Sequence, residues 1–131
     1  MTLDRIQPAA LGRQTGPFVA GVRSGRFLFI SGQVARNADG SIAGVGDARA
    51  QAIKVHENMK AVLDSVGATF ADITKVTVYL TDLSHREVIQ QVRREYFGKD
   101  EPASTMVQVA GLVHPDFLLE IEAIAEIPGA D

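Results

Sequence analysis

A change in the spacing of apolar residues constrains the fold of this chain most. Between Asp47 and Val66 the apolar residues recur every three or four positions, which is the spacing of one face of a helix. Asp47 can cap the start of this helix, and Gly67 can close its end. From Ile73 to Leu80 the spacing falls to two, the period of a strand. The chain must therefore combine a helix of about five turns with a β-sheet.

Two short β-rich segments precede the helix. Phe18–Val22 and Arg26–Gln33 are separated by Arg23-Ser24-Gly25, a gap of turn length that contains the glycine expected of a hairpin. We expect the two segments to pair as antiparallel strands.

A second helix and two more strands follow the strand at 73–80. Ser84 and Glu87 have the spacing of a capping box at a helix start, and Gly98 can end that helix. Segments 105–109 and 118–127 favour strands. The order β-β-α-β-α-β-β predicts an α+β fold in which both helices cover one face of a mixed sheet, while the other face meets water or another subunit.

Composition narrows the class of protein. The chain has 131 residues, 46% of them hydrophobic, which suits a single domain over residues 1–131. Its net charge of −3 disfavours a nucleic-acid surface, which needs clustered Lys and Arg. No apolar stretch approaches the roughly 20 residues of a membrane span, so we expect a soluble, cytoplasmic protein. There is no cysteine, and the three histidines are scattered, so the sequence predicts no metal site.

Two carboxylates in an apolar strand are candidates for chemistry. Glu120 and Glu122 are two residues apart and therefore share one face of the strand. Adjacent like charges raise each other's pKa, which suits a group that delivers a proton or positions water. The alternative interpretation is that one or both lie at a solvent rim or pair with a Lys or Arg.

Two other runs suggest the walls of a pocket. Ser31-Gly32-Gln33 places a glycine in an apolar strand, which marks a bulge or a close approach by another group, although a simple strand end is the alternative. In a pocket, backbone near Gly32 would form a wall and Gln33 would offer an amide. In the run Pro102–Thr105, Ser104 and Thr105 present hydroxyl groups. We predict that this run and Glu120 line one cleft between subunits.

Taken in order, several short motifs resemble the Rid (YjgF/YER057c/UK114) family of reactive-intermediate deaminases. The resemblance covers about residues 16–127 and rests on six segments: Gly16-Pro17-Phe18, Ile30–Gln33, Gln51–Asn58, Lys75–Leu83, Pro102-Ala103 and Glu120–Ala125. It implies a chorismate-mutase-like α+β domain that forms a homotrimer with ligand pockets between subunits. Such an assembly would cover the free face of the sheet.

The resemblance also implies an activity. The best-known branch hydrolyses 2-imino acids, the tautomers of enamines, to 2-keto acids and ammonia without a cofactor. Glu120 matches the residue that positions water or protonates the nitrogen, and Phe18 matches a site aromatic that is commonly tyrosine. Backbone near Gly32 would line the same cleft.

One position departs from the deaminating branch. There the Pro-Ala pair is followed by an arginine that holds the substrate carboxylate, whereas this chain has Ser104. Loss of a bidentate ion pair at such a site costs about 2–5 kcal/mol of binding. We therefore expect 2-iminopropanoate to be a poor substrate.

Three functions follow from these residues. The first is hydrolysis of a different imine or enamine, such as a larger acid, with the missing cation supplied by Arg23, Arg26, Arg36 or Arg93. The second is binding of a small metabolite, such as a carboxylic acid, by a non-catalytic trimer. The third is a chaperone-like role in protein interaction.

Overall fold

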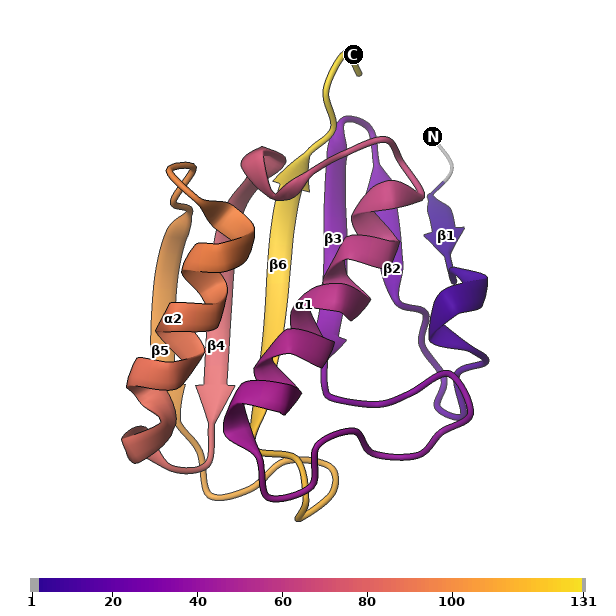
Figure 1. Ribbon diagram of the computed structural model, residues 1–131. Helices are drawn as coiled ribbons and strands as arrows, with labels where there is room; N and C mark the ends of the chain where they lie inside the picture. Colours follow the sequence, from indigo (N-terminus) through magenta and orange to yellow (C-terminus); the bar gives the residue numbers. More distant parts are fainter. Residues whose placement is uncertain (1–2, 131) are drawn as a thin grey trace.

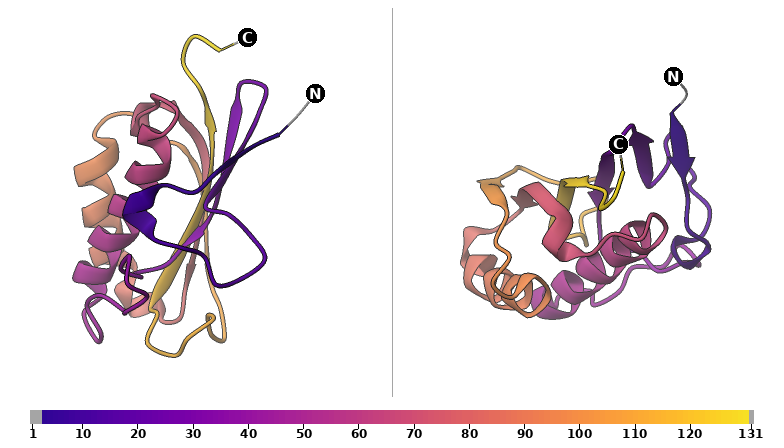
Figure 2. Two further views of the ribbon diagram at one scale, coloured as in Figure 1. Left: turned by 90° about the vertical axis from the view of Figure 1, so that its right-hand side faces the viewer. Right: turned by 90° about the horizontal axis from the view of Figure 1, so that it is seen from above.

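The computed structural model describes residues 3–130 and folds them into a sheet with two α-helices against one face (Figures 1 and 2). The strands are β1 (Asp4–Ile6), β2 (Gly21–Ser24), β3 (Phe27–Gln33), β4 (Ile73–Leu80), β5 (Ala103–Gln108) and β6 (Leu119–Glu126). The helices are α1 (Ala48–Asp64) and α2 (Arg86–Phe97), with 3-10 turns η1 (Ala9–Leu11), η2 (Phe70–Asp72) and η3 (Leu83–His85). The predicted α+β fold, with both helices on one face of a mixed sheet, is confirmed.

The strand order across the sheet is β1-β2-β3-β6-β4-β5. Strands β4 and β5 are parallel because α2 carries the chain back between them, and the other neighbours are antiparallel. Strand β1 was not predicted, since three residues are too few to show a period. Within residues 3–130, no α-helix covers the opposite, open face of the sheet (Figure 2).

The β2–β3 hairpin is tighter than its sequence indicates. Ser24 pairs with Phe27, so the turn consists of Gly25 and Arg26, and Gly25 has a φ of +61°. The predicted turn at Arg23-Ser24-Gly25 is wrong because Arg23 and Ser24 continue β2. Phe18 lies before β2 rather than in it.

The ends of the helices follow the sequence in three of four cases. The Asp47 side chain accepts a hydrogen bond from the backbone N–H of Ala50 (3.0 Å), and Gly67 and Gly98 adopt positive φ after α1 and α2. The capping box predicted at Ser84 is wrong. There Asp82 accepts the Ser84 N–H (2.8 Å) and starts η3, which runs directly into α2.

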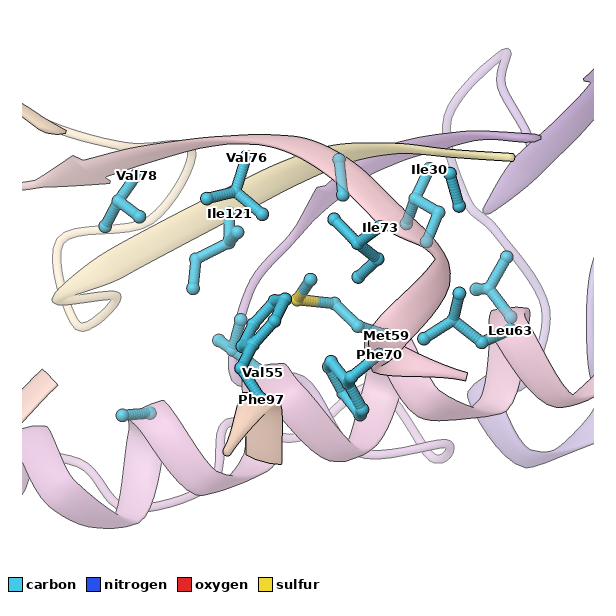
Figure 3. Packing of buried hydrophobic residues seen from close by; sticks show 14 of the residues in the cluster. Ile30, Val55, Met59, Leu63, Phe70, Ile73, Val76, Val78, Phe97 and Ile121 are labelled. Carbon is cyan, nitrogen blue, oxygen red and sulfur yellow. The ribbon is translucent and has the colours of Figure 1, made fainter. Parts of the chain in front are cut away.

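The core lies between the helices and the sheet (Figure 3). Met59 and Leu63 of α1 point toward Ile73 of β4 and Ile30 of β3 (Figure 3), and all four are almost fully buried. Leu119 and Ile121 are buried against the helices. Because side chains alternate along β6, Glu120 between them points toward the open face.

A buried amide ties α1 to the segment that leads into β6. Gln51 is fully buried, and its Nε2 donates to the carbonyls of Asp116 (2.7 Å) and Gly44 (3.3 Å). Its Oε1 accepts the Leu118 N–H (2.8 Å). One side chain therefore satisfies three backbone groups in irregular segments, which have no strand or helix partner there.

We expect Gln51→Leu to lower the free energy of unfolding by about 3 kcal/mol, because an apolar side chain of similar size removes the hydrogen bonds to the Asp116 carbonyl and the Leu118 N–H. Urea denaturation monitored by circular dichroism would measure the change. The control is Gln91→Leu, an exposed position on α2, which should change stability by less than about 0.5 kcal/mol. Equal stability of both variants would contradict this role for Gln51.

Candidate functional site

Strand β3 contains a bulge at the predicted glycine. Ile30 pairs with Ala123 and Gln33 pairs with Ile121, so Ser31 and Gly32 together lie opposite a single residue of β6. A bulge of this kind bends the strand and redirects its side chains. The interpretation of Gly32 as the mark of a bulge is confirmed.

Gly32 also permits a close approach. A Cβ built at Gly32 would overlap Oε2 of Glu120 and lie 2.9 Å from its Cγ. The carboxylate of Glu120 thus occupies the space that any other residue at position 32 would fill. The bulge and the glycine together create the position in which Glu120 lies.

The two carboxylates of β6 have different surroundings. Glu120 is half-buried, and its burial, followed by the charge of Glu122, raises its pKa above the usual value. Glu122 is exposed and accepts a hydrogen bond from the Tyr79 hydroxyl (2.9 Å). Among residues 3–130, Glu120 has no Lys or Arg within ion-pair distance. Glu122 therefore lies at the rim, and Glu120 is the carboxylate whose pKa is raised.

Five of the predicted site residues meet at one cavity of about 560 Å³. Glu120 and Gly32 contribute one wall, and Ser31, Gln33 and Phe18 line the same space. A volume of this size suits a small-molecule ligand.

Two polar side chains near Gly32 form hydrogen bonds with the backbone. The Ser31 hydroxyl donates to the carbonyl of Val19 (2.7 Å), and the Gln33 amide donates to the carbonyl of Ser31 (3.1 Å). Gln33 is buried, whereas Phe18 is 55% exposed at the rim. These side chains fix the shape of the wall, and Phe18 offers an apolar surface to a ligand.

Further polar residues line the cavity, among them Arg36, Arg13 and Asn58. Arg36 was a predicted candidate cation, whereas Arg13 and Asn58 were not singled out from the sequence. Asn58 donates from Nδ2 to the carbonyls of Val34 and Arg36, both at 3.1 Å, and so fixes the segment after β3. A buried asparagine on the apolar face of α1 was the available signal.

Ser104 and Thr105 lie elsewhere. Ser104 pairs with Val76, a core residue, so its side chain is on the helix side of the sheet. Thr105 pairs with Thr77 on the open face, and its hydroxyl accepts a hydrogen bond from Nζ of Lys75 (3.1 Å). Neither residue lines the cavity that contains Glu120.

Within one chain, the 102–105 run and Glu120 therefore do not share a cleft, and the cleft between subunits stays a prediction. Strand β4 separates β5 from β6, and alternation along β5 places Ser104 on the face opposite to Glu120. Ser104 instead lines a second pocket of about 300 Å³, where Nη1 of Arg93 donates to its hydroxyl (2.8 Å).

Two features that would indicate other functions are absent from residues 3–130. No group of three or more His, Cys, Asp or Glu side chains in this range is arranged to hold a metal ion. No helix in the same range has the length and apolar character to cross a membrane.

The fold and the site define a class of small α+β proteins in which a strand glutamate lies against a glycine bulge at a ligand-sized cavity. Residues 8–127 match the family described as Endoribonuclease L-PSP. The chain belongs to this family, also called the Rid or YjgF/YER057c/UK114 family, and the resemblance found in the sequence is confirmed.

Individual members of the family are similar to this chain in sequence and in structure. A RutC family protein of Pyrococcus abyssi is 40% identical over 110 residues, which cover 84% of this chain and 86% of that protein. The crystal structure of E. coli TdcF with bound serine is 36% identical, with a TM-score of 0.86 over 94% of this chain and 98% of that one. The Rid protein YyfA of Yersinia pestis is 28% identical, with a TM-score of 0.90 over 96% and 100%.

Proposed function

We propose that this protein hydrolyses a reactive imine, or the enamine that is its tautomer, to a carbonyl compound and ammonia. The observation that supports this most is Glu120, a half-buried carboxylate with a raised pKa that lies against Gly32 in the wall of a cavity. Such a group can hold a water molecule or a proton at a bound ligand.

The reaction needs little beyond orientation. The C=N carbon of an imine is already electrophilic, so water adds to it and the nitrogen is protonated. The resulting carbinolamine then expels ammonia and leaves a C=O group. Glu120 would position the water or transfer the proton, while the wall near Gly32 and the ring of Phe18 would orient the substrate. In this proposal the chemistry requires no cofactor.

The proposal includes a homotrimer with its pockets between subunits. The open face of the sheet exposes Phe29 and Val107 (45% and 39%), which supports burial of this face against another copy. In such an assembly, Ser104 and Thr105 of one subunit would complete the cleft that begins at Glu120 of its neighbour. Light scattering that reports a monomer at working concentration would contradict it.

The type of ligand is a small polar molecule. TdcF, which is 36% identical, has been crystallised with bound serine, and this supports an amino-acid-like compound as the ligand of the present cavity. An imino acid has the same backbone, with a C=N group in place of the amine.

A non-catalytic trimer that binds a small metabolite is the second candidate. Ser104 stands where the deaminating branch has arginine, and this replacement favours binding of a different ligand over turnover of 2-iminopropanoate. A chaperone-like role has less support, because among residues 3–130 the exposed large apolar side chains are scattered apart from those on the open sheet face.

Ammonia release tests the proposal. Imines of increasing length would be generated in the assay from amino acids by an amino-acid oxidase, and the rate compared with and without this protein. We expect acceleration for at least one imine, with 2-iminopropanoate among the slower ones. No acceleration for any imine would overturn the proposed hydrolysis in favour of metabolite binding.

A further inference from the structure

Arg93 is a half-buried cation in an unusual setting. It leaves α2 toward β5, passes over the ring of Phe97 (5.8 Å to the centroid), and donates from Nη1 to Oγ of Ser104 (2.8 Å). Burial lowers the pKa of Arg93 from its usual value, although a guanidinium remains charged at neutral pH. Partial removal of water from this charge costs free energy, and an arginine exposed at the surface does not have this cost.

No carboxylate offsets that cost by direct contact. Arg49 has Glu95 at 2.7 Å and Arg26 has Glu126 at 3.4 Å, but within residues 3–130 no acidic group lies within 4.0 Å of the Arg93 guanidinium. Glu101 lines the same pocket and acts on Arg93 only at longer range. The remaining N–H groups of Arg93 are thus available to an anion that enters the pocket.

The position of the Arg93 guanidinium suggests which ligand group it could bind. It lies beside the residue after Pro102-Ala103, the position at which the deaminating branch of the family carries its own arginine. A serine at this position has a short side chain and leaves space that the Arg93 guanidinium reaches from α2. The chain therefore places a cation beside this position from a different element, α2.

We infer that Arg93 binds the carboxylate of the substrate, with the Ser104 hydroxyl beside it. The inference rests on the proposed function, because it assigns the anion site of the same cleft. An arginine on β5 would extend several bonds outward from the strand, whereas the Arg93 guanidinium lies close to the strand at Ser104. The carboxylate then sits deeper, and the cleft accommodates imino acids longer than 2-iminopropanoate.

Binding of stable product-like acids tests this assignment without turnover. Isothermal titration of the full chain with 2-oxohexanoate and with its uncharged amide would compare wild type, Arg93→Gln and the control Arg86→Gln, an exposed arginine on the same helix. We expect Arg93→Gln to weaken binding of the acid by at least about tenfold. Binding of the amide should change little, and Arg86→Gln should match wild type for both.

A double variant distinguishes loss of the cation from misfolding as the cause of weaker acid binding. In Arg93→Gln/Ser104→Arg the cation lies on β5, so the double variant should bind the short acid pyruvate more tightly than Arg93→Gln does, while its binding of 2-oxohexanoate should stay weak. No gain in pyruvate binding, in a double variant with native circular dichroism, would contradict the relocation of the anion site.

The outcomes separate the two claims. If wild type hydrolyses imines but Arg93→Gln binds the acid as tightly as wild type, the assignment of Arg93 is overturned and the hydrolysis stands. If wild type hydrolyses no imine but Arg93→Gln loses the acid, the hydrolysis fails and the anion site stands. Wild type that binds no acid, or binds the amide equally well, overturns the assignment.

Discussion

Glu120→Gln should lower kcat/KM for imine hydrolysis by at least about a hundredfold. The amide has nearly the shape of the carboxylate, but it can neither accept a proton from water nor donate one as a carboxylic acid. The fold should be unaffected. In the folded protein the pKa of Glu120 is raised by burial, so the charged form is disfavoured relative to the unfolded chain, and stability at neutral pH should be unchanged or slightly higher.

The control is Glu122→Gln, two residues along the same face. Glu122 lies at the rim and contributes to the raised pKa of Glu120 through its charge. Its removal should lower the pKa of Glu120. If Glu120 acts as a carboxylate that positions water, activity falls as pH drops through its pKa, and Glu122→Gln moves this fall to lower pH.

A steady-state pH profile of ammonia release would show the shift. If Glu120 acts instead as a protonated acid, activity falls as pH rises, and Glu122→Gln again moves that limb to lower pH. Glu120→Gln with activity within about twofold of wild type would remove Glu120 from the chemistry, because general acid-base groups contribute far more.

The elements that the sequence predicted well are those with a strong period. Helix α1 and strand β4 each show their spacing over many residues, and β4 has the predicted bounds, 73–80. The elements that it missed depend on few residues or on partners. Strand β1 has three residues, and the start of α2 depends on Asp82, which forms a 3-10 turn ahead of the helix.

The site also has features that the sequence predicted and features that it could not predict. A glycine in the β3 strand and a glutamate in the β6 strand were each visible as local anomalies, but their contact depends on the pairing of β3 with β6, which no spacing reveals. The separation of Ser104 from Glu120 within one chain was not visible, because sequence shows neither the intervening β4 nor the face on which β5 presents each side chain. Arg93 was one of four candidate cations, and its contact with Ser104, on which our inference rests, could not be predicted from spacing.

The contact between Gly32 and Glu120 leads to the second large effect. We expect Gly32→Ala to lower kcat/KM by roughly a hundredfold, because displacement of a catalytic group by about 1 Å has an effect of this size. The added methyl group would overlap Oε2 and would lie 2.7 Å from Cδ and 2.9 Å from Cγ of Glu120. The carboxylate must therefore move away from the wall of the cavity.

Stability should change much less than activity in this variant. Gly32 does not have a positive φ, so alanine is allowed by the backbone, and the atoms that must move are the far end of a flexible side chain. The matched control is Gly111→Ala, since Gly111 also lacks a positive φ and has no heavy atom within 4 Å of the added Cβ. It should retain wild-type activity.

Combination with Glu120→Gln gives the sharpest comparison. If Gly32→Ala acts by displacing Glu120, the double variant should be no less active than Glu120→Gln alone, because residues that act as a unit are not additive. If the two losses multiply instead, Gly32 acts on the substrate directly through its backbone. A Gly32→Ala protein with full activity would mean that Glu120 does not need its place against β3.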